Sequence, residues 1–132
     1  MAAAGTAASA ILLFATGGAA QALASALQRG GHRVAAATSE EEALQALEDT
    51  RYDLVVVHLP RANPERLDVI KLMRMSDPGD KGPPVVVLAD AMNADVEQAC
   101  ADARVDLRLV SPVDPSHLLD YVADLLARSR SD

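Results

Sequence analysis

Short apolar runs alternate along the chain with longer stretches in which apolar residues recur at helical spacing. The apolar runs cover residues 10–14, 32–37, 53–59, 84–88 and 107–110. The third and fourth runs are built mainly from valine and leucine, as in strands of a parallel sheet that are buried on both faces. In the stretches between them, apolar residues return every three or four positions, which is typical of amphipathic helices. The pattern predicts five strand–helix units in sequence.

Polar residues and prolines mark where several of these helices begin. Ser39 followed by Glu42 has the form of a capping box, with a cap hydroxyl and a glutamate three residues later. Residues 63–64 and 114–115 each place Asn or Asp before a proline, which predicts a cap followed by the first helical residue. A further helix is predicted over 93–103. Each of these starts follows one of the apolar runs.

The order of the elements predicts the fold class. Strands that alternate with helices form parallel sheets with right-handed crossovers. We therefore expect an α/β protein, a (βα)5 doubly wound five-stranded parallel sheet of flavodoxin-like topology. The length of 132 residues is that of one domain, so we expect a single domain over residues 1–132 with its core at about 9–129.

Charge and cysteine content exclude several classes of function. The net charge of −7 argues against nucleic acid and anionic membranes as partners, and favours proteins or cations. The single cysteine, Cys100, forms no internal disulfide and is predicted to be a small core residue of a helix. No basic residue precedes Arg29, and Gly17 and Gly18 interrupt the first apolar stretch. We therefore expect no signal peptide, no membrane span and a cytoplasmic location.

Five stretches of the chain, in their order and spacing, together carry a resemblance to a known family. They are residues 11–14, 39–44, 52–57, 84–88 and 111–115. The chain resembles the response-regulator receiver (CheY-like) domains of bacterial two-component signalling. This resemblance implies the same (βα)5 fold and a role in bacterial signalling.

The chain departs from that family at the residues that take up a phosphoryl group. Active receivers have an acidic pair after the first strand, where this chain has Ala15 and Thr16. By the same resemblance, His58 replaces the phosphate-accepting aspartate, Ala89 a Ser or Thr, and Ser111 a lysine. The absent carboxylates would hold Mg²⁺, which prefers oxygen ligands. We therefore expect a degenerate, non-phosphorylatable pseudo-receiver without a metal or other cofactor.

Residues near this pocket leave several interpretations open. His58 is a phosphohistidine acceptor, a pH-sensitive contact, or a structural histidine hydrogen-bonded to nearby backbone. Asp90 is either a compensating acid in the same crevice or an ordinary loop acid. His32 and His117 are too distant in the sequence to suggest a shared metal site with His58. Arg66 stands where the family usually has a glycine.

The resemblance places the interaction surface on the last two helices and the strand between them. The candidate residues are Asp95, Gln98, Arg108, Tyr121 and Asp124. Each of the acids is otherwise an ordinary solvated residue. The predicted function is therefore a protein–protein interaction module that binds a kinase, scaffold or regulator, or a second copy of itself. The alternative is a sensor that binds a small ligand at the carboxyl ends of the strands. An enzyme is not expected, because no catalytic motif is present.

Overall fold

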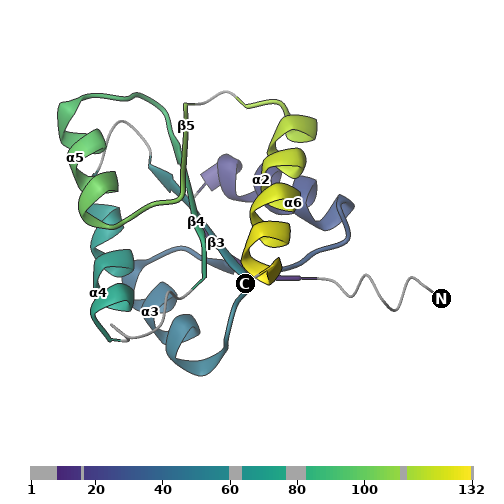
Figure 1. The fold of residues 1–132 in the computed structure, drawn as a ribbon, viewed down its shortest axis with the longest axis horizontal. Helices are drawn as coiled ribbons and strands as arrows, with labels where there is room; N and C mark the ends of the chain where they lie inside the picture. Colours follow the sequence, from purple (N-terminus) through teal and green to yellow (C-terminus); the bar gives the residue numbers. More distant parts are fainter. Residues whose placement is uncertain (1–8, 16, 60–63, 77–82, 111–112, 132) are drawn as a thin grey trace.

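One five-stranded parallel sheet organises the chain, with helices on both of its faces (Figure 1). The computed structural model describes residues 9–15, 17–59, 64–76, 83–110 and 113–131. The elements in chain order are β1 (Ala10–Phe14), α2 (Gly17–Arg29), β2 (Arg33–Ala37), α3 (Glu40–Asp49), β3 (Leu54–Leu59), the 3₁₀ helix η2 (Pro64–Leu67), α4 (Asp68–Ser76), β4 (Val85–Ala89), α5 (Ala94–Asp102), β5 (Leu107–Val110) and α6 (Pro115–Ser131). The strand order is β2-β1-β3-β4-β5, and every neighbouring pair is parallel. The predicted fold class is confirmed.

Side chains of the strands alternate between two apolar clusters, one on each face of the sheet. Ile11 and Leu13 of β1 lie in the cluster under α2 and α6, where Leu27 is fully buried. Leu12 and Phe14 lie in the other cluster, under α3, α4 and α5. Every residue of β3 is buried, as the valine run predicts for a central strand. Because burial of a Leu or Val side chain is worth about 1.5–3 kcal/mol, these clusters supply most of the force that holds the layers together.

The predicted helix cap at Ser39 is confirmed, and Asn93 is the cap of the helix that was predicted over 93–103. The Ser39 hydroxyl accepts a hydrogen bond from the Glu42 amide at 3.1 Å, and the Asn93 side chain accepts one from the Val96 amide at 2.9 Å. The Glu42 carboxylate differs from the predicted capping box. It accepts bonds from the amide and hydroxyl of Thr38, both at 2.7 Å, so it reaches one residue beyond the cap. These bonds lower the pKa of Glu42, because they favour the ionised carboxylate.

The two predicted proline starts differ from each other. Asp114 accepts a hydrogen bond from the Ser116 amide at 2.8 Å, and α6 begins at Pro115 as expected. Asn63 lies outside the described residues. Pro64 begins η2, and the α-helix itself starts at Asp68. A short 3₁₀ turn is common where a helix begins, so the proline sets the start of the turn rather than of the α-helix.

Arg74 links three segments at the amino ends of β4 and β5. Its guanidinium donates to the carbonyls of Pro83, Ala103 and Arg104, at 3.2, 3.4 and 3.1 Å. It also lies 3.5 Å from the Asp106 carboxylate, which accepts the amide of Val85 at 2.7 Å. Burial lowers the pKa of Arg74, and the charge of Asp106 opposes this effect. Arg74 and Asp106 are called the amino-end cluster below.

Cys100 lies in the core on α5 and is 2% exposed, as the sequence predicts. Burial raises the pKa of its thiol. A protonated, enclosed thiol is a poor nucleophile and packs as a small apolar group.

The described helices also bear on the membrane question. The longest of them, α6, has 17 residues and includes Asp120, Asp124 and Arg128. Within the described part of the chain, every helix is too short or too polar to cross a lipid bilayer.

Candidate functional site

Three predicted pocket positions meet at the carboxyl ends of the central strands. Ala15 directly follows β1, His58 lies near the end of β3, and Ala89 is the last residue of β4. The register of the strands brings them to nearly the same level of the sheet. Ala15 and Ala89 are fully buried, so their methyl groups close this edge with apolar surface. The other two predicted positions, Thr16 and Ser111, lie outside the described residues.

His58 is held by an acid rather than by backbone. Its Nε2 atom lies 2.9 Å from Oδ1 of Asp90, which stands just after β4. Of the interpretations left open by the sequence, a His58 ring bonded to nearby backbone is wrong, and Asp90 turns toward the same crevice. The amide of Asp90 donates to the Leu59 carbonyl at 3.0 Å, and this bond holds the loop beside β3. The His58 side chain is 9% exposed and that of Asp90 is 42% exposed.

The second ring nitrogen of His58 is enclosed. Nδ1 is buried and has no hydrogen-bond partner among the described residues. If Nε2 carries the proton and donates it to Asp90, Nδ1 is left as an acceptor without a donor. A buried polar atom in this state costs stability, so the pair is not optimised for the fold alone.

Arg66 covers the same strand ends from the 3₁₀ turn. Its Nη1 atom donates to the carbonyl of His58 at 3.1 Å, and its guanidinium lies 4.9 Å above the centre of the Phe14 ring. Burial lowers the pKa of Arg66, and the negative charge of Glu40 opposes this effect. Sequence analysis noted this residue only as a replacement for glycine. A long cationic side chain at a position that usually holds glycine was the signal in the sequence that could have indicated these contacts.

The described donor set does not suit Mg²⁺. At this edge of the sheet it consists of the Asp90 carboxylate and the His58 imidazole, while Ala15 supplies no ligand atom. Mg²⁺ prefers an octahedral shell of oxygens, and imidazole suits Zn²⁺ or Cu²⁺ better. Among the residues that the structure describes, no three His, Cys, Asp or Glu side chains are grouped as metal ligands.

The predicted interaction residues surround the edge strand β5. Arg108 of β5 lies with Nη1 3.9 Å from the Glu97 carboxylate of α5, and both side chains are about half exposed. Tyr121 of α6 is 42% exposed. Val110 is 49% exposed and was missed by sequence analysis, although the two-residue period of β5 places it on the same side as Arg108. Since α5 and α6 lie on opposite sides of β5 (Figure 1), these residues are distributed over both sides of this edge strand.

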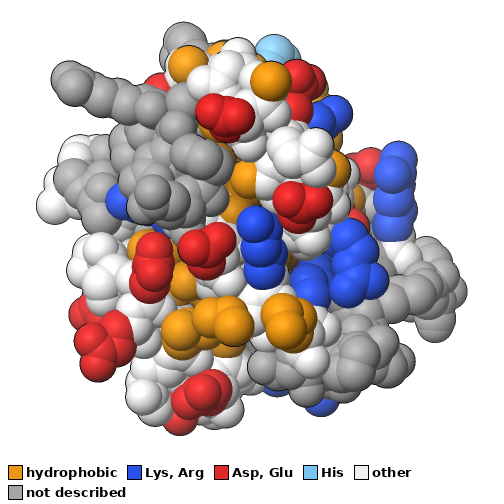
Figure 2. Space-filling view, turned by 90° about the vertical axis from the view of Figure 1, so that its left-hand side faces the viewer, with side chains coloured by type: hydrophobic (Ala, Val, Ile, Leu, Met, Phe, Trp, Pro, Cys, Tyr) orange, Lys and Arg blue, Asp and Glu red, His pale blue; other side chains and the backbone are white. Residues whose placement is uncertain are grey.

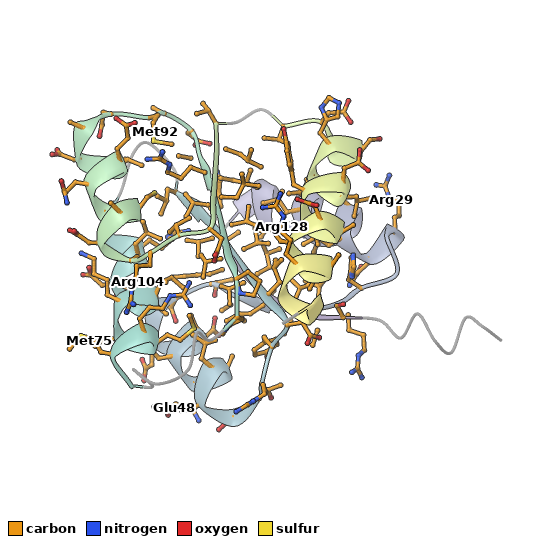
Figure 3. The ribbon with its side chains drawn as sticks, in the orientation of Figure 1. Arg29, Glu48, Met75, Met92, Arg104 and Arg128 are labelled. Carbon is orange, nitrogen blue, oxygen red and sulfur yellow. The ribbon has the colours of Figure 1, made fainter. Side chains whose placement is uncertain are left out.

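The remaining predicted interaction residues are engaged within their own helices. Gln98 donates to Asp102 at 2.9 Å, and Asp124 lies 3.1 Å from Arg128, which Figure 3 labels on α6. Asp95 is exposed in the first turn of α5. These three side chains are therefore available at the surface. The contacts of Gln98 and Asp124 are weak enough for a partner to replace them.

Two comparisons relate the chain to known proteins, and a third finds no match. No protein-family model matches the sequence. The sensory/regulatory protein RpfC of Xanthomonas campestris pv. campestris is 34% identical over 105 residues. That alignment covers 79% of this chain but 14% of the relative, so the chain corresponds to a small part of a much longer protein.

Solved structures match most of the chain. A CheY-like receiver domain protein from Methanospirillum hungatei superimposes with a TM-score of 0.82 at 18% identity, covering 94% of this chain and 98% of that one. A response regulator from Thermotoga maritima gives a TM-score of 0.76 at 23% identity, covering 91% and 98%. The chain has the fold of response-regulator receiver domains.

Proposed function

We propose that this chain is a signalling module of the receiver type that takes up no phosphoryl group and acts by binding a protein partner. The proposed module spans residues 1–132, with its core at about 9–129. The observation that supports it most directly is the state of His58. It stands at the expected acceptor position, is almost fully buried and is hydrogen-bonded to Asp90.

Each route to phosphorylation meets a specific obstacle. An acyl phosphate needs a carboxylate, and position 58 has none. A phosphohistidine needs a free ring nitrogen, but Nε2 is bonded to Asp90 and Nδ1 is buried. Charge on the phosphoryl group also needs a metal ion to neutralise it, and Ala15 contributes no ligand for one. Several residues that phosphorylation needs are replaced at the carboxyl end of the sheet. A single neighbouring side chain is therefore unable to restore the site.

The surface around β5 is the proposed binding face. Arg and Tyr are enriched in protein interfaces, and here Arg108 and Tyr121 are both about half exposed. As an edge strand, β5 also presents backbone groups that a partner strand or loop can pair with. The proposed partner is a kinase, scaffold or regulator, or a second copy of the chain, in the cytoplasm of a bacterium. The proposal includes no enzymatic activity, nucleic acid, membrane or cofactor.

The pocket is tested by amide NMR during a titration with Mg²⁺, followed by beryllofluoride as a phosphoryl mimic. We expect no saturable shift at Ala15, His58 or Ala89. The variant His58→Asp should remain equally inert, because one restored carboxylate supplies too few ligands for Mg²⁺. Saturable shifts at these residues in the wild type would overturn the proposal. Stabilisation by one compound of a metabolite panel would instead support the ligand-sensing alternative.

The binding face is tested with matched arginines on the two edge strands. Arg108→Ala and Tyr121→Ala should each weaken partner capture or self-association about tenfold, because truncation of an interface residue commonly has this effect. Arg33→Ala, an exposed arginine of the opposite edge strand β2, should leave binding unchanged. Equal loss in Arg108→Ala and Arg33→Ala would show that positive charge, rather than this face, determines binding.

A further inference from the structure

The outer backbone groups of the edge strand β5 are open. On its inner side, the Asp106 amide donates to the Val85 carbonyl of β4 at 2.9 Å. Because backbone groups alternate in direction along a strand, the N–H and C=O groups of Leu107 and Leu109 point away from β4. Within the described residues, these outward groups have no hydrogen-bond partner. β5 also contains neither proline nor lysine, which often protect such an edge from pairing.

The side chains along this edge carry opposite charges two residues apart. Arg108 lies on the face of the sheet that α5 covers, and the alternation of strand side chains places Asp106 on the same face. Asp106 is partly exposed, and its contacts within the described part of the chain both use Oδ2. The ion pair of Arg108 with Glu97 is long, at 3.9 Å, and half exposed. Both charges can therefore take a further partner at small cost.

This charge pattern distinguishes the registers in which two copies of β5 could pair as antiparallel strands. Only Leu107 and Leu109 can exchange backbone hydrogen bonds with the other copy. If Leu107 pairs with Leu109, the two copies of Arg108 lie directly opposite each other and repel. If Leu109 pairs with itself across a two-fold axis, Arg108 lies opposite Val110 and gains no charge partner. If Leu107 pairs with itself, each Asp106 lies opposite Arg108 of the other copy.

The opposite edge strand, β2, lacks this self-complementary pattern. Its outward backbone groups belong to Val34 and Ala36, because the Arg33 amide donates to Ser9 on the β1 side. On the face that carries Arg33, the following positions of β2 are alanines. Two copies of β2 would therefore bring no opposite charges together, so the pattern selects β5.

The surrounding surface also favours a copy of the chain over a partner with charges of one sign. On the side that carries α4 and α5, acidic and basic side chains are interspersed (Figure 2). A strongly acidic or strongly basic partner would meet repulsion there as well as attraction. A two-fold pair instead brings each charge of β5 opposite a charge of the other sign.

We propose that two copies of this chain pair through β5 as antiparallel strands, with Leu107 at the two-fold axis and Asp106 of each copy opposite Arg108 of the other. The two copies of Leu107 exchange hydrogen bonds in both directions, and the two sheets become one continuous sheet. Each Leu109 amide lies opposite Val105 of the other copy. This inference rests on the function proposed above, because it takes β5 as the binding face and names a second copy as the partner.

Self-association is measured by analytical ultracentrifugation at about 0.15 M salt, because charges more than about 8 Å apart are then largely screened. This screening reduces the repulsion between copies that each carry a net charge of −7. We expect a monomer–dimer equilibrium. Amide hydrogen exchange at Leu107 and Leu109 should slow as the protein concentration rises, since these amides become hydrogen-bonded. The matched outward amides of Val34 and Ala36 should exchange at the same rate at every concentration.

The register is tested by NMR on a mixture of differently isotope-labelled copies. We expect contacts between the Cα hydrogens of Asp106 in one copy and Arg108 in the other, because the Cα atoms of such a pair lie about 4.5 Å apart. Arg108→Glu should weaken dimerisation at least tenfold, since each Asp106 then faces an acid. Arg33→Glu changes the net charge equally and should alter dimerisation less than about twofold.

Several results would overturn this inference. They are a monomer at all concentrations, a dimer with unchanged exchange at Leu107 and Leu109, contacts between the two copies of Arg108, and equal weakening by the two charge reversals. Capture of a kinase or scaffold through Arg108 and Tyr121 by a chain that stays monomeric would overturn this inference alone. Saturable shifts at Ala15 with Mg²⁺ in a chain that still pairs through β5 would overturn the proposed function alone.

Discussion

The two ends of the sheet each place a buried basic side chain beside a partly exposed aspartate. At the amino ends, Arg74 is 10% exposed and Asp106 40%. At the carboxyl ends, the corresponding values for His58 and Asp90 are 9% and 42%. All three guanidinium nitrogens of Arg74 donate hydrogen bonds to backbone carbonyls. One ring nitrogen of His58 is bonded to Asp90, and the other is buried with no partner among the described residues.

The two pairs therefore differ in how much they contribute to the fold. The amino-end cluster supplies hydrogen-bond donors to three backbone carbonyls of two loops, so its bonds contribute directly to folding. Within the described part of the chain, the imidazole ring of His58 bonds no backbone group, and its Nδ1 atom has no partner. Stability of the fold therefore gives only a weak reason for a histidine at position 58.

The largest effect is expected for Arg74→Met. The substitution keeps much of the side-chain volume but leaves the carbonyls of Pro83, Ala103 and Arg104 without their donor. We expect a loss of about 3 kcal/mol in the free energy of unfolding, measured by urea denaturation. Arg128→Met, which removes an exposed arginine paired only with Asp124 on the surface of α6, should change it by less than about 0.5 kcal/mol. Similar values for the two variants would show that the amino-end cluster does not hold the fold.

A much smaller effect is expected for His58→Phe. Phenylalanine fills a similar volume, removes the unsatisfied Nδ1, and lets the partly exposed Asp90 turn toward water. The free energy of unfolding should stay within about 1 kcal/mol of the wild type or increase slightly. If urea denaturation shows a loss above about 2 kcal/mol, the two ends of the sheet are energetically alike and the comparison fails.

The smallest effect is expected for Glu42→Gln, and it depends on pH. Folding lowers the pKa of Glu42 below its ordinary value of 4.5, so its contribution to stability is fully present above that pH. That contribution is lost as the pH falls through the lower pKa of the folded state. Thermal unfolding should therefore show the wild type above the variant at neutral pH, and the two should converge in acid. A constant difference down to the most acidic pH would contradict the role of the Thr38 bonds.

The sequence placed several site positions correctly but missed their partners. The resemblance to receiver domains identified Ala15, His58 and Ala89 as pocket positions, and the structure places all three at one edge of the sheet. The sequence did not predict that Arg66 would cover Phe14 or that Asp90 would become the partner of His58. Those contacts depend on how two loops return to the sheet, and hydrophobic periodicity contains no information on loop paths.

The sequence alone determined the elements, their order and the cap at Ser39, because these depend on interactions within a few residues. The runs of valine also determined which strands are buried on both faces. The tertiary structure decided what each polar side chain meets. The His58–Asp90 bond joins residues 32 positions apart, and Arg74 reaches carbonyls up to 30 positions away. Such contacts form only when the register of the strands and the packing of the helices have brought distant segments together.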